Sequence, residues 1–361
     1  MKTIFLTGAT GFLGTHLVKE FLNKKACTLI CLIRSENTKA AAKKLEKAMD
    51  KYEMSLNESE WKHIQLVCGD LEKEKLGMTD EEYERVATEA DVVFHNAAWV
   101  NWLLPAELLG RVNILGTRRM LALSNYKKNK KFYFVSSLSI FPFDGEDYEE
   151  TTDIDQEFYL YGGYAQSKWL AEMVVQKAIS DGKDAIIFRP NLITGRTKDG
   201  VFSRSAFFEN CIKSFIQLKA APKLAQTYMA VVPVDYVSQG MVQVVFDEET
   251  KQKVFHLSNA GYAAIGDIVD WVGDMGYEIE EMELEEWKHK LFASKDFYTN
   301  ALYQFKPFVY GLEDGYMLMG KAYSKQTDTY MEKNEIVCHP IDQELVKTYV
   351  EYFVSSGFME V

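Results

Sequence analysis

The sequence is poor in cysteine, and its five cysteines are odd in number and scattered along the chain. Three of them, Cys27, Cys31 and Cys68, fall in short apolar runs, where a free thiol packs as a small hydrophobic side chain. An odd set of buried thiols favours a reducing compartment. None of them has the spacing of a zinc site together with histidine partners. We therefore expect free thiols, no bound metal and a cytoplasmic protein.

The sequence also lacks an excess of positive charge and any long apolar run. Its formal net charge is −12, whereas nucleic acids bind clustered positive fields, so a nucleic-acid partner is not expected. No apolar run approaches the roughly 20 residues that cross a bilayer. The chain opens on a strand-like run and not on a signal peptide. These absences predict a protein with no nucleic-acid partner and no membrane segment.

What the chain does contain is a regular alternation of strand-like and helix-like segments from residue 2 to about residue 190. With 361 residues and 47% hydrophobic content it can bury a large core. The alternation predicts an α/β fold of the Rossmann type, a doubly wound parallel sheet with helices on both faces. The predicted strands are 3–7, 28–33, 64–68, 92–95, 132–136, 185–188 and 254–257. The predicted helices are 12–23, 38–51, 79–89, 106–125 and 164–180.

After residue 190 the rhythm changes to helical stretches rich in phenylalanine, tyrosine and methionine. This change predicts a smaller, mostly helical C-terminal substrate domain. We place the Rossmann domain at 1–200 plus about 230–260, and the substrate or lid domain at 201–229 and 261–361. An acidic stretch at 142–160 is expected to form a long loop on the catalytic side.

A glycine-rich run, from Gly8 to Gly14, follows the first predicted strand and opens the first predicted helix. Its spacing is G-x-x-G-x-x-G. Gly8 permits the tight turn, Gly11 lets the backbone approach a pyrophosphate, and Gly14 permits close packing of the helix. The free N–H groups of the helix start favour an anion. The run predicts a dinucleotide site, with a glycine turn that serves packing alone as the alternative, at Gly8, Thr10, Gly11, Phe12, Leu13 and Gly14.

The second predicted strand ends in Arg34, where NAD enzymes carry an acid that holds the ribose. A guanidinium suits a 2′-phosphate, so NADPH is the expected cofactor, with Lys44 as a second cation. The alternative is that Arg34 is only a surface residue at a strand end. Asp70 and Leu71 follow the third strand, and Asp70 is expected either to accept a hydrogen bond from the adenine amino group or to be a plain turn residue.

A tyrosine and a lysine, Tyr164 and Lys168, lie four residues apart on one predicted helix and so share a face. The lysine charge is expected to lower the pKa of the phenol. Ser137 follows the strand 132–136 and would add a second donor to an oxygen that gains negative charge. The alternatives are a half-buried tyrosine beside a solvated lysine, and a serine that only caps a turn.

These motifs, with Asn96-Ala97-Ala98, Asn113 and Arg189-Pro190, together resemble the extended short-chain dehydrogenases/reductases. More narrowly, the runs 95–102 and 162–169 resemble the thioester reductase domains that terminate nonribosomal peptide synthetases. The likeness covers nearly the whole chain. Within it, Ser137 stands where many relatives have threonine, and Asn191 stands where relatives often have glycine after Arg-Pro.

The resemblance implies NADPH-dependent release of an acyl or peptidyl thioester from a phosphopantetheinylated carrier protein, as an aldehyde or further as the alcohol. Tyr164 would be the proton donor, Lys168 would orient the ribose, and Asn113 would support the lysine. The cofactor would also contact Asn96, Ala97, Ala98 and Pro190. A related reductase of the carboxylic acid, α-aminoadipate or fatty acyl-CoA type is the alternative, and a sugar-nucleotide epimerase or dehydratase that uses NAD is a weaker one.

The predicted carrier-protein partner needs a basic surface, because carrier proteins are usually acidic and so is this chain. Arg196, Lys198 and Arg204 follow the sixth predicted strand at the catalytic edge of the sheet. We expect docking there, and we expect the protein to be monomeric.

Overall fold

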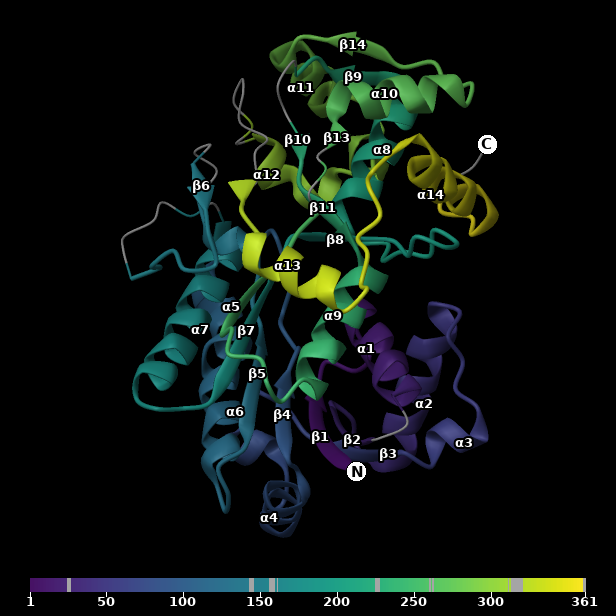
Figure 1. The fold of residues 1–361 in the computed structure, drawn as a ribbon. Helices are drawn as coiled ribbons and strands as arrows, with labels where there is room; N and C mark the ends of the chain where they lie inside the picture. Colours follow the sequence, from purple (N-terminus) through teal and green to yellow (C-terminus); the bar gives the residue numbers. More distant parts are fainter. Residues whose placement is uncertain are drawn as a thin grey trace.

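The computed structural model describes residues 1–24, 27–142, 146–155, 160, 162–224, 228–259, 261, 263–310, 312 and 321–359. Its centre is one seven-stranded sheet with the order β12-β7-β5-β4-β1-β2-β3 (Figure 1). All its pairings are parallel. The strands are β1 (Lys2–Thr7), β2 (Cys27–Ile33), β3 (Ile64–Cys68), β4 (Val92–His95), β5 (Lys131–Val135), β7 (Ala185–Pro190) and β12 (Val254–Leu257). The strand order and the parallel pairing confirm the predicted Rossmann-type fold.

Helices cover both faces of this sheet because successive strand residues point to opposite faces. In β1, Ile4 and Leu6 belong to one hydrophobic core, whereas Phe5 between them belongs to the other. The first core includes residues of α1 (Phe12–Asn23), α2 (Thr38–Lys51) and α9 (Val234–Phe246). The second includes residues of α4 (Asp80–Glu89), α6 (Leu115–Asn125) and α7 (Gly162–Ser180). A short helix, α3 (Glu58–Trp61), precedes β3.

One predicted helix, 106–125, is two helices in the structure. α5 (Ala106–Asn113) and α6 are separated at Ile114. On either side of the break the chain is tied to other elements. The Asn113 side chain bonds the main chain of Trp99, and a Cβ on Gly116 would lie 3.1 Å from Leu71 Cβ. The break therefore follows from tertiary contacts that helical periodicity does not reveal.

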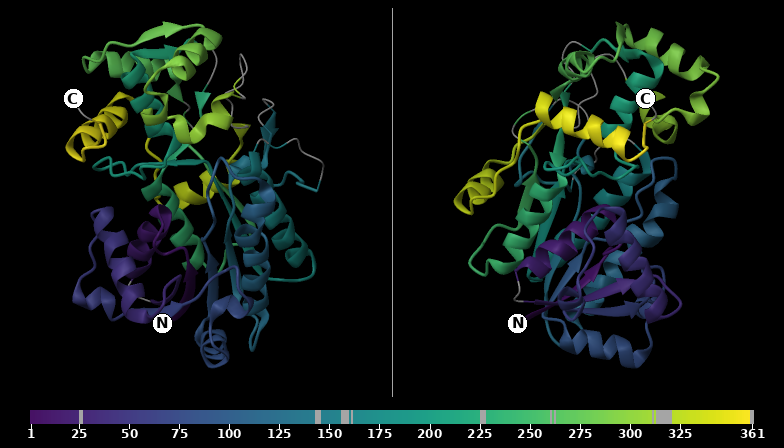
Figure 2. Two further views of the ribbon diagram at one scale, coloured as in Figure 1. Left: turned by 180° about the vertical axis from the view of Figure 1, so that it is seen from behind. Right: turned by 90° about the vertical axis from the view of Figure 1, so that its right-hand side faces the viewer.

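Most of the remaining elements gather at the end of the sheet opposite the N-terminus (Figures 1 and 2). Many of their apolar side chains, from Phe202 to Met359, form a hydrophobic core of their own. The helices are α8 (Phe207–Leu218), α10 (Ile265–Asp274), α11 (Leu284–Ala293), α12 (Lys306–Tyr310), α13 (Lys325–Lys333) and α14 (Gln343–Ser355). The small strands are β6 (Asp147–Tyr148), β8 (Leu192–Thr194), β9 (Ala220–Pro222), β10 (Tyr228–Met229), β11 (Val231–Pro233), β13 (Ala263–Ala264), β14 (Glu280–Met282) and β15 (Lys321–Ala322). Single 3-10 turns are η1 (Glu74–Gly77), η2 (Leu138–Ile140), η3 (Phe297–Thr299) and η4 (Tyr303–Phe305).

The two predicted domains exchange segments at their boundary. α13 lies in the range 261–361, yet its Met331 is buried in a core of the sheet. The acidic stretch 142–160 contains the short strand β6, and its residues 143–145 and 156–159 lie outside the described residues. The domain limits themselves stay a prediction. Within the described ranges, none of the helices combines the length and the apolar character that crossing a membrane requires.

Candidate active site

A cavity of about 720 Å³ lies across the carboxyl ends of the parallel strands. Residues that follow β1, β2, β3, β4, β5 and β7 line it, and it spans the point between β1 and β4 where the strand order reverses. Open α/β sheets bind ligands at this place. The lining includes these predicted site residues: Gly8, Thr10, Gly11, Phe12, Leu13, Gly14, Arg34, Asp70, Leu71, Asn96, Ala97, Ala98, Ser137, Tyr164, Lys168 and Pro190.

The glycine loop has the geometry of an anion cradle. Gly8 has a positive φ of 77°, and its carbonyl accepts a hydrogen bond from Gly11 N at 3.0 Å. A Cβ on Gly14 would lie 1.8 Å from Gly8 O, so only glycine lets α1 start this close to the loop. In the described part of the chain, no side chain caps the N-terminus of α1 at Gly11. These residues therefore fit the pyrophosphate of a dinucleotide.

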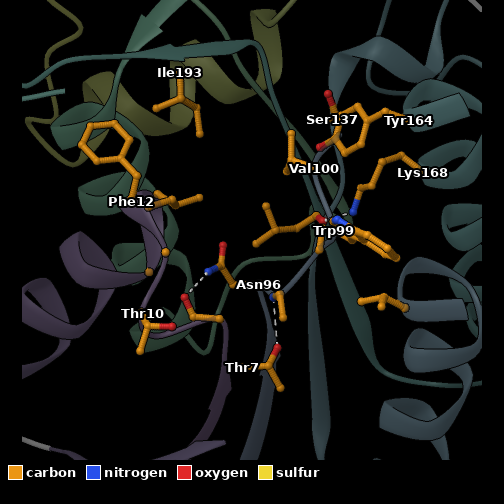
Figure 3. A pocket seen from close by; sticks show the side chains of 18 of the residues that line it. Thr7, Thr10, Phe12, Asn96, Trp99, Val100, Ser137, Tyr164, Lys168 and Ile193 are labelled. Atoms are coloured by element: carbon orange, nitrogen blue, oxygen red, sulfur yellow. Dashed lines mark hydrogen bonds between the residues drawn. The ribbon is translucent and has the colours of Figure 1, made fainter. Parts of the chain in front are cut away.

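The end of β4 is bonded to the loop that follows β1. Ala97 N donates to Thr7 Oγ1 at 3.1 Å, and Asn96 Nδ2 donates to Gly8 O at 3.4 Å (Figure 3). Beneath them the His95 ring bridges Thr7 and Thr117 with contacts of 2.9 and 3.1 Å. Burial, with a smaller effect of the Lys168 charge, lowers the pKa of His95 to about 3. His95 is therefore a neutral structural bridge, and Asn96 and Ala97 are held at the pocket floor.

Two cations lie at the end of β2. Arg34 is exposed and lines the pocket, and Lys44 Nζ donates to Arg34 O at 2.6 Å. Lys44 is not among the lining residues. The first turn of α2 contains no acidic residue, and the Asn37 side chain caps it by accepting from Ala40 N. The end of β2 therefore presents positive charge beside a helix N-terminus, which suits a phosphate.

Asp70 at the end of β3 lines the pocket and also shapes a turn. Its Oδ1 accepts from Glu72 N at 3.0 Å, and its main-chain N donates to Leu76 O at 2.7 Å. Asp70 is therefore a turn residue, as one of its two predicted roles has it. Its contact with adenine stays a prediction.

Ser137, Tyr164 and Lys168 come together on the other side of the pocket from Thr10 and Phe12 (Figure 3). Ser137 Oγ accepts from both the main-chain N and the hydroxyl of Ser139, at 3.1 and 2.9 Å. Because Ser137 Oγ is the acceptor in both hydrogen bonds, its own O–H can donate into the pocket. Lys168 Nζ donates to Val135 O at 2.6 Å and lies 4.4 Å from the centre of the Phe134 ring.

Burial dominates the titration of this pair. It raises the pKa of Tyr164 to about 12. It lowers the pKa of Lys168 to about 7, against the opposing effect of the Glu172 carboxylate. The sequence-based expectation was that the lysine lowers the pKa of the phenol, and the structure corrects it: desolvation of the phenolate outweighs the lysine charge. Tyr164 is therefore protonated at neutral pH.

Asn113 lies behind the pocket and does not line it. It is buried, its Oδ1 accepts from Trp99 N at 2.7 Å, and its Nδ2 donates to Ser167 Oγ at 2.9 Å. Asn113 thus ties the loop after β4 to α7 beside Lys168. Its predicted support of Lys168 stays a prediction.

A buried ion pair anchors α7 to the sheet. Arg189 of β7 bonds Glu172 Oε1 through Nε and Nη2, at 3.0 and 2.6 Å. Arg189 Nη1 also contacts His256 Nε2 at 3.0 Å. Because Glu172 lies one turn after Lys168, this ion pair fixes the part of α7 that carries the lysine.

Several residues that line the pocket were not predicted as site residues from the sequence. Trp99 and Trp102 lie in the run 95–102 that carries the resemblance, and both line the pocket. The segment around Phe207 lies in the predicted substrate or lid domain and carries no motif. Ser136 is buried with no hydrogen-bond partner for its Oγ among the described residues, and its place in the pair Ser136-Ser137 was the only signal. The lining residues missed include Ser136, Ser139, Leu192, Ser203, Ser205, Ala206 and Phe207.

The site contains no evident metal centre. Across the described ranges, no group of three or more histidine, cysteine, aspartate or glutamate side chains is placed to hold an ion.

Comparisons with known proteins agree with this geometry. The family model NAD_binding_4, described as Male sterility protein, matches residues 6–241. A linear gramicidin synthase protein of Brevibacillus parabrevis is 30% identical over 371 residues, which cover 100% of this chain. The match covers 7% of that synthase protein, so the chain spans a small fraction of this relative's length.

Two solved structures are similar over nearly the whole chain. One is the terminal R domain from the myxalamid PKS-NRPS biosynthetic pathway, with a TM-score of 0.94 and 28% identity, covering 100% of this chain and 92% of that one. The other is a thiolation-reductase di-domain from an archaeal non-ribosomal peptide synthetase. It has a TM-score of 0.82 and 25% identity and covers 99% of this chain and 76% of that one.

Proposed function

The chain belongs to the NAD_binding_4 family, described as Male sterility protein, and on that premise we propose that it is an NADPH-dependent thioester reductase. Its substrate is an acyl or peptidyl thioester on the phosphopantetheine arm of a carrier protein, which it releases as an aldehyde. One observation carries the proposal. Ser137, Tyr164 and Lys168 share a single pocket with the glycine loop, in a chain similar to the terminal R domain named above.

The cofactor is held by three groups of residues. The loop Gly8–Gly14 and the start of α1 take the pyrophosphate. Arg34 and Lys44 take the 2′-phosphate, which is why NADPH and not NADH is proposed. Lys168 takes the ribose hydroxyls of the nicotinamide half, once its Nζ turns from Val135 O. An epimerase would use the same tyrosine and lysine with NAD, and the cations at the end of β2 argue against it.

NADPH bound here would supply the hydride that reduces the thioester carbonyl. The chain's own residues stabilise the negative charge on the carbonyl oxygen and supply its proton. Ser137 Oγ and Tyr164 Oη donate to the carbonyl oxygen as it gains negative charge. Because the pKa of Tyr164 is raised to about 12, the phenol carries the proton at neutral pH and gives it to that oxygen. The C–S bond of the resulting thiohemiacetal then breaks, which leaves the aldehyde and the free thiol of the arm.

The direct test is NADPH oxidation with a carrier-bound or coenzyme A thioester. The wild type should consume NADPH, and Tyr164→Phe should lower kcat by about 10²- to 10⁴-fold, since it removes the proton donor. Tyr298→Phe is the matched control, because Tyr298 is 76% exposed and does not line the pocket. No turnover by the wild type, or full activity of Tyr164→Phe, would overturn the proposal.

We place the carrier-docking surface at Lys198 and Arg204. Both are exposed beside the catalytic edge of the sheet, whereas Arg196, the third cation expected there, pairs with Asp199 at 2.8 Å. Arg204 is held by its bond to Ser356 O at 3.0 Å. The double change Lys198→Glu and Arg204→Glu should raise KM for the carrier-bound thioester and spare a coenzyme A thioester. Equal effects on both substrates would contradict this docking site.

A further inference from the structure

The pocket is charged at one end and neutral at the other. Its lining contains four charged residues. Arg34, Asp70 and Glu72 follow β2 and β3, on one side of the switch point, and Lys168 lies with the catalytic tyrosine. Beyond Tyr164, none of the described lining residues carries a charge, and the wall there is formed by Trp102, Leu192, Ser203, Ser205, Ala206 and Phe207.

Aromatic rings build this neutral wall and connect it to Tyr164. The Trp102 ring centre lies 5.7 Å from that of Tyr164 and 6.1 Å from that of Phe305. Phe305 in turn lies 5.0 Å from Phe207, edge to face. The rings come from the loop after β4, from η4 and from the start of α8. Trp102 and Phe207 line the pocket beside the proton donor, and Phe305, which is buried and does not line it, packs between them.

The wall is backed by the hydrophobic core of the C-terminal elements, whose residues run from Phe202 to Met359. Phe207 and Phe305 belong to that core, and Trp102 and Leu192 pack against it. An apolar acyl chain laid on this wall gains about three- to four-fold in affinity for each buried methylene. A carboxylate or ammonium on the chain would be desolvated there without a counter-charge from the described lining, which disfavours it strongly.

We propose that the acyl group of the substrate is uncharged and apolar, and that Trp102 and Phe207 set this preference. The proposal rests on the proposed function and specifies its substrate class. An apolar acyl group would distinguish the substrate of this chain from α-aminoadipate, whose acyl chain is charged. Trp102 and Phe207 are specificity residues here, because they contact the acyl chain and not the reacting bond.

The test compares coenzyme A thioesters of acetyl, butyryl and hexanoyl groups with a glutaryl thioester that ends in a carboxylate. In the wild type, kcat/KM should rise by about three- to four-fold per methylene. The glutaryl thioester should fall at least about 100-fold below hexanoyl. Trp102→Ala and Phe207→Ala should flatten the chain-length series, and Trp102→Phe should keep it.

The control is Trp271→Ala, since Trp271 also packs against the core of the C-terminal elements but does not line the pocket. It should leave the series intact, and thermal unfolding of each variant reports folding separately. Two results would overturn the inference. One is equal use of the charged and apolar chains. The other is a loss in Trp102→Ala that is the same for acetyl and hexanoyl, which would mean that the wall holds the arm and not the acyl chain.

Binding separates the inference from the proposed function. Non-reducible S-ethyl, S-butyl, S-hexyl and S-carboxyalkyl thioethers of coenzyme A need no turnover, and their Kd values are measured by calorimetry. A Kd that falls with chain length and is poor for the carboxyalkyl thioether supports the inference even if no thioester is reduced. A Kd that is indifferent to length and charge overturns the inference even if reduction occurs.

Discussion

The buried Nζ of Lys168 donates a 2.6 Å hydrogen bond to the main-chain oxygen of Val135, at the last residue of β5. Ser137 follows two residues later, and Tyr164 lies one turn before Lys168 on α7. This bond therefore ties α7 to the strand end that Ser137 follows. Burial lowers the pKa of Lys168 to about 7, which makes its charge sensitive to pH near neutrality.

Activity should therefore fall as the pH rises through about 7. The lowered pKa means that Lys168 is charged below this value and neutral above it. Only the charged form makes strong charge-assisted hydrogen bonds. We expect kcat/KM for NADPH to be flat at low pH and to decline above about pH 7, and Lys168→Met to lower activity and abolish the decline. Lys177 is an exposed lysine on the same helix, where it pairs with Asp181. Lys177→Met should keep the decline in activity above about pH 7. A decline that persists in Lys168→Met would assign it to another group.

Arg34 should decide between the two nicotinamide cofactors. Loss of a charge-assisted bond to the 2′-phosphate costs about 1.5–3 kcal/mol. Arg34→Ala should therefore raise KM for NADPH by about 10- to 100-fold and leave KM for NADH nearly unchanged. Lys47→Ala is the matched control, since Lys47 is an exposed cation of α2, the helix that follows Arg34, and does not line the pocket. If Arg34→Ala weakened both cofactors equally, Arg34 would not be the 2′-phosphate site.

Gly14 should tolerate no side chain. A Cβ there would lie 1.8 Å from Gly8 O, so Gly14→Ala must push α1 away from the loop. We expect a loss of about 1–3 kcal/mol in the free energy of unfolding, together with loss of NADPH binding. Gly273→Ala is the control within another helix, where no atom lies within 4 Å of the added Cβ. It should gain up to about 1 kcal/mol, and denaturant titration measures both. A harmless Gly14→Ala would refute the close-approach argument.

Glu209 should make the protein less stable as the pH rises. Glu209 is fully buried, its Oε1 accepts from Gly195 N at 2.7 Å, and burial raises its pKa from 4.5 to about 8. Between these values the folded state keeps a proton that the unfolded state releases, so stability present below pH 4.5 is lost as the pH rises toward 8.

Glu209→Gln removes this titration and keeps an oxygen for Gly195 N. The stability of the variant relative to the wild type should increase by about 1.4 kcal/mol per pH unit across that window. Urea titrations of both proteins at pH 5, 6, 7 and 8 measure the difference. A difference that does not change with pH would show that Glu209 is already ionised in the folded protein.

Much of the sheet was predictable because parallel strands buried on both faces leave short apolar runs in the sequence. The strands 64–68, 92–95 and 254–257 and the helices 12–23 and 38–51 have the predicted limits. The glycine loop and the pair Tyr164 and Lys168 were also visible, because local spacing specifies them. What the spacing did not show is burial. The spacing predicted a lysine beside the phenol of Tyr164. It did not predict the desolvation that raises the pKa of Tyr164.

The rest depends on contacts between distant parts of the chain. The break at Ile114 follows from the bonds of Asn113 to Trp99, which helical periodicity does not encode. Phe207 reaches the pocket because Phe305, about a hundred residues later, packs against it. No local pattern marks such a residue, since an aromatic side chain at the start of a helix is most often part of a core.

The most direct test of the central claim follows the hydride itself. The purified protein is given NADPH that carries deuterium at the transferable position, with an acyl thioester on a phosphopantetheinylated carrier protein, and the released product is analysed by mass spectrometry. The account predicts an aldehyde with one deuterium on its carbonyl carbon and a stoichiometric amount of free carrier thiol, both strongly reduced in Tyr164→Phe. Release of the free acid, or of an aldehyde without deuterium, would contradict it.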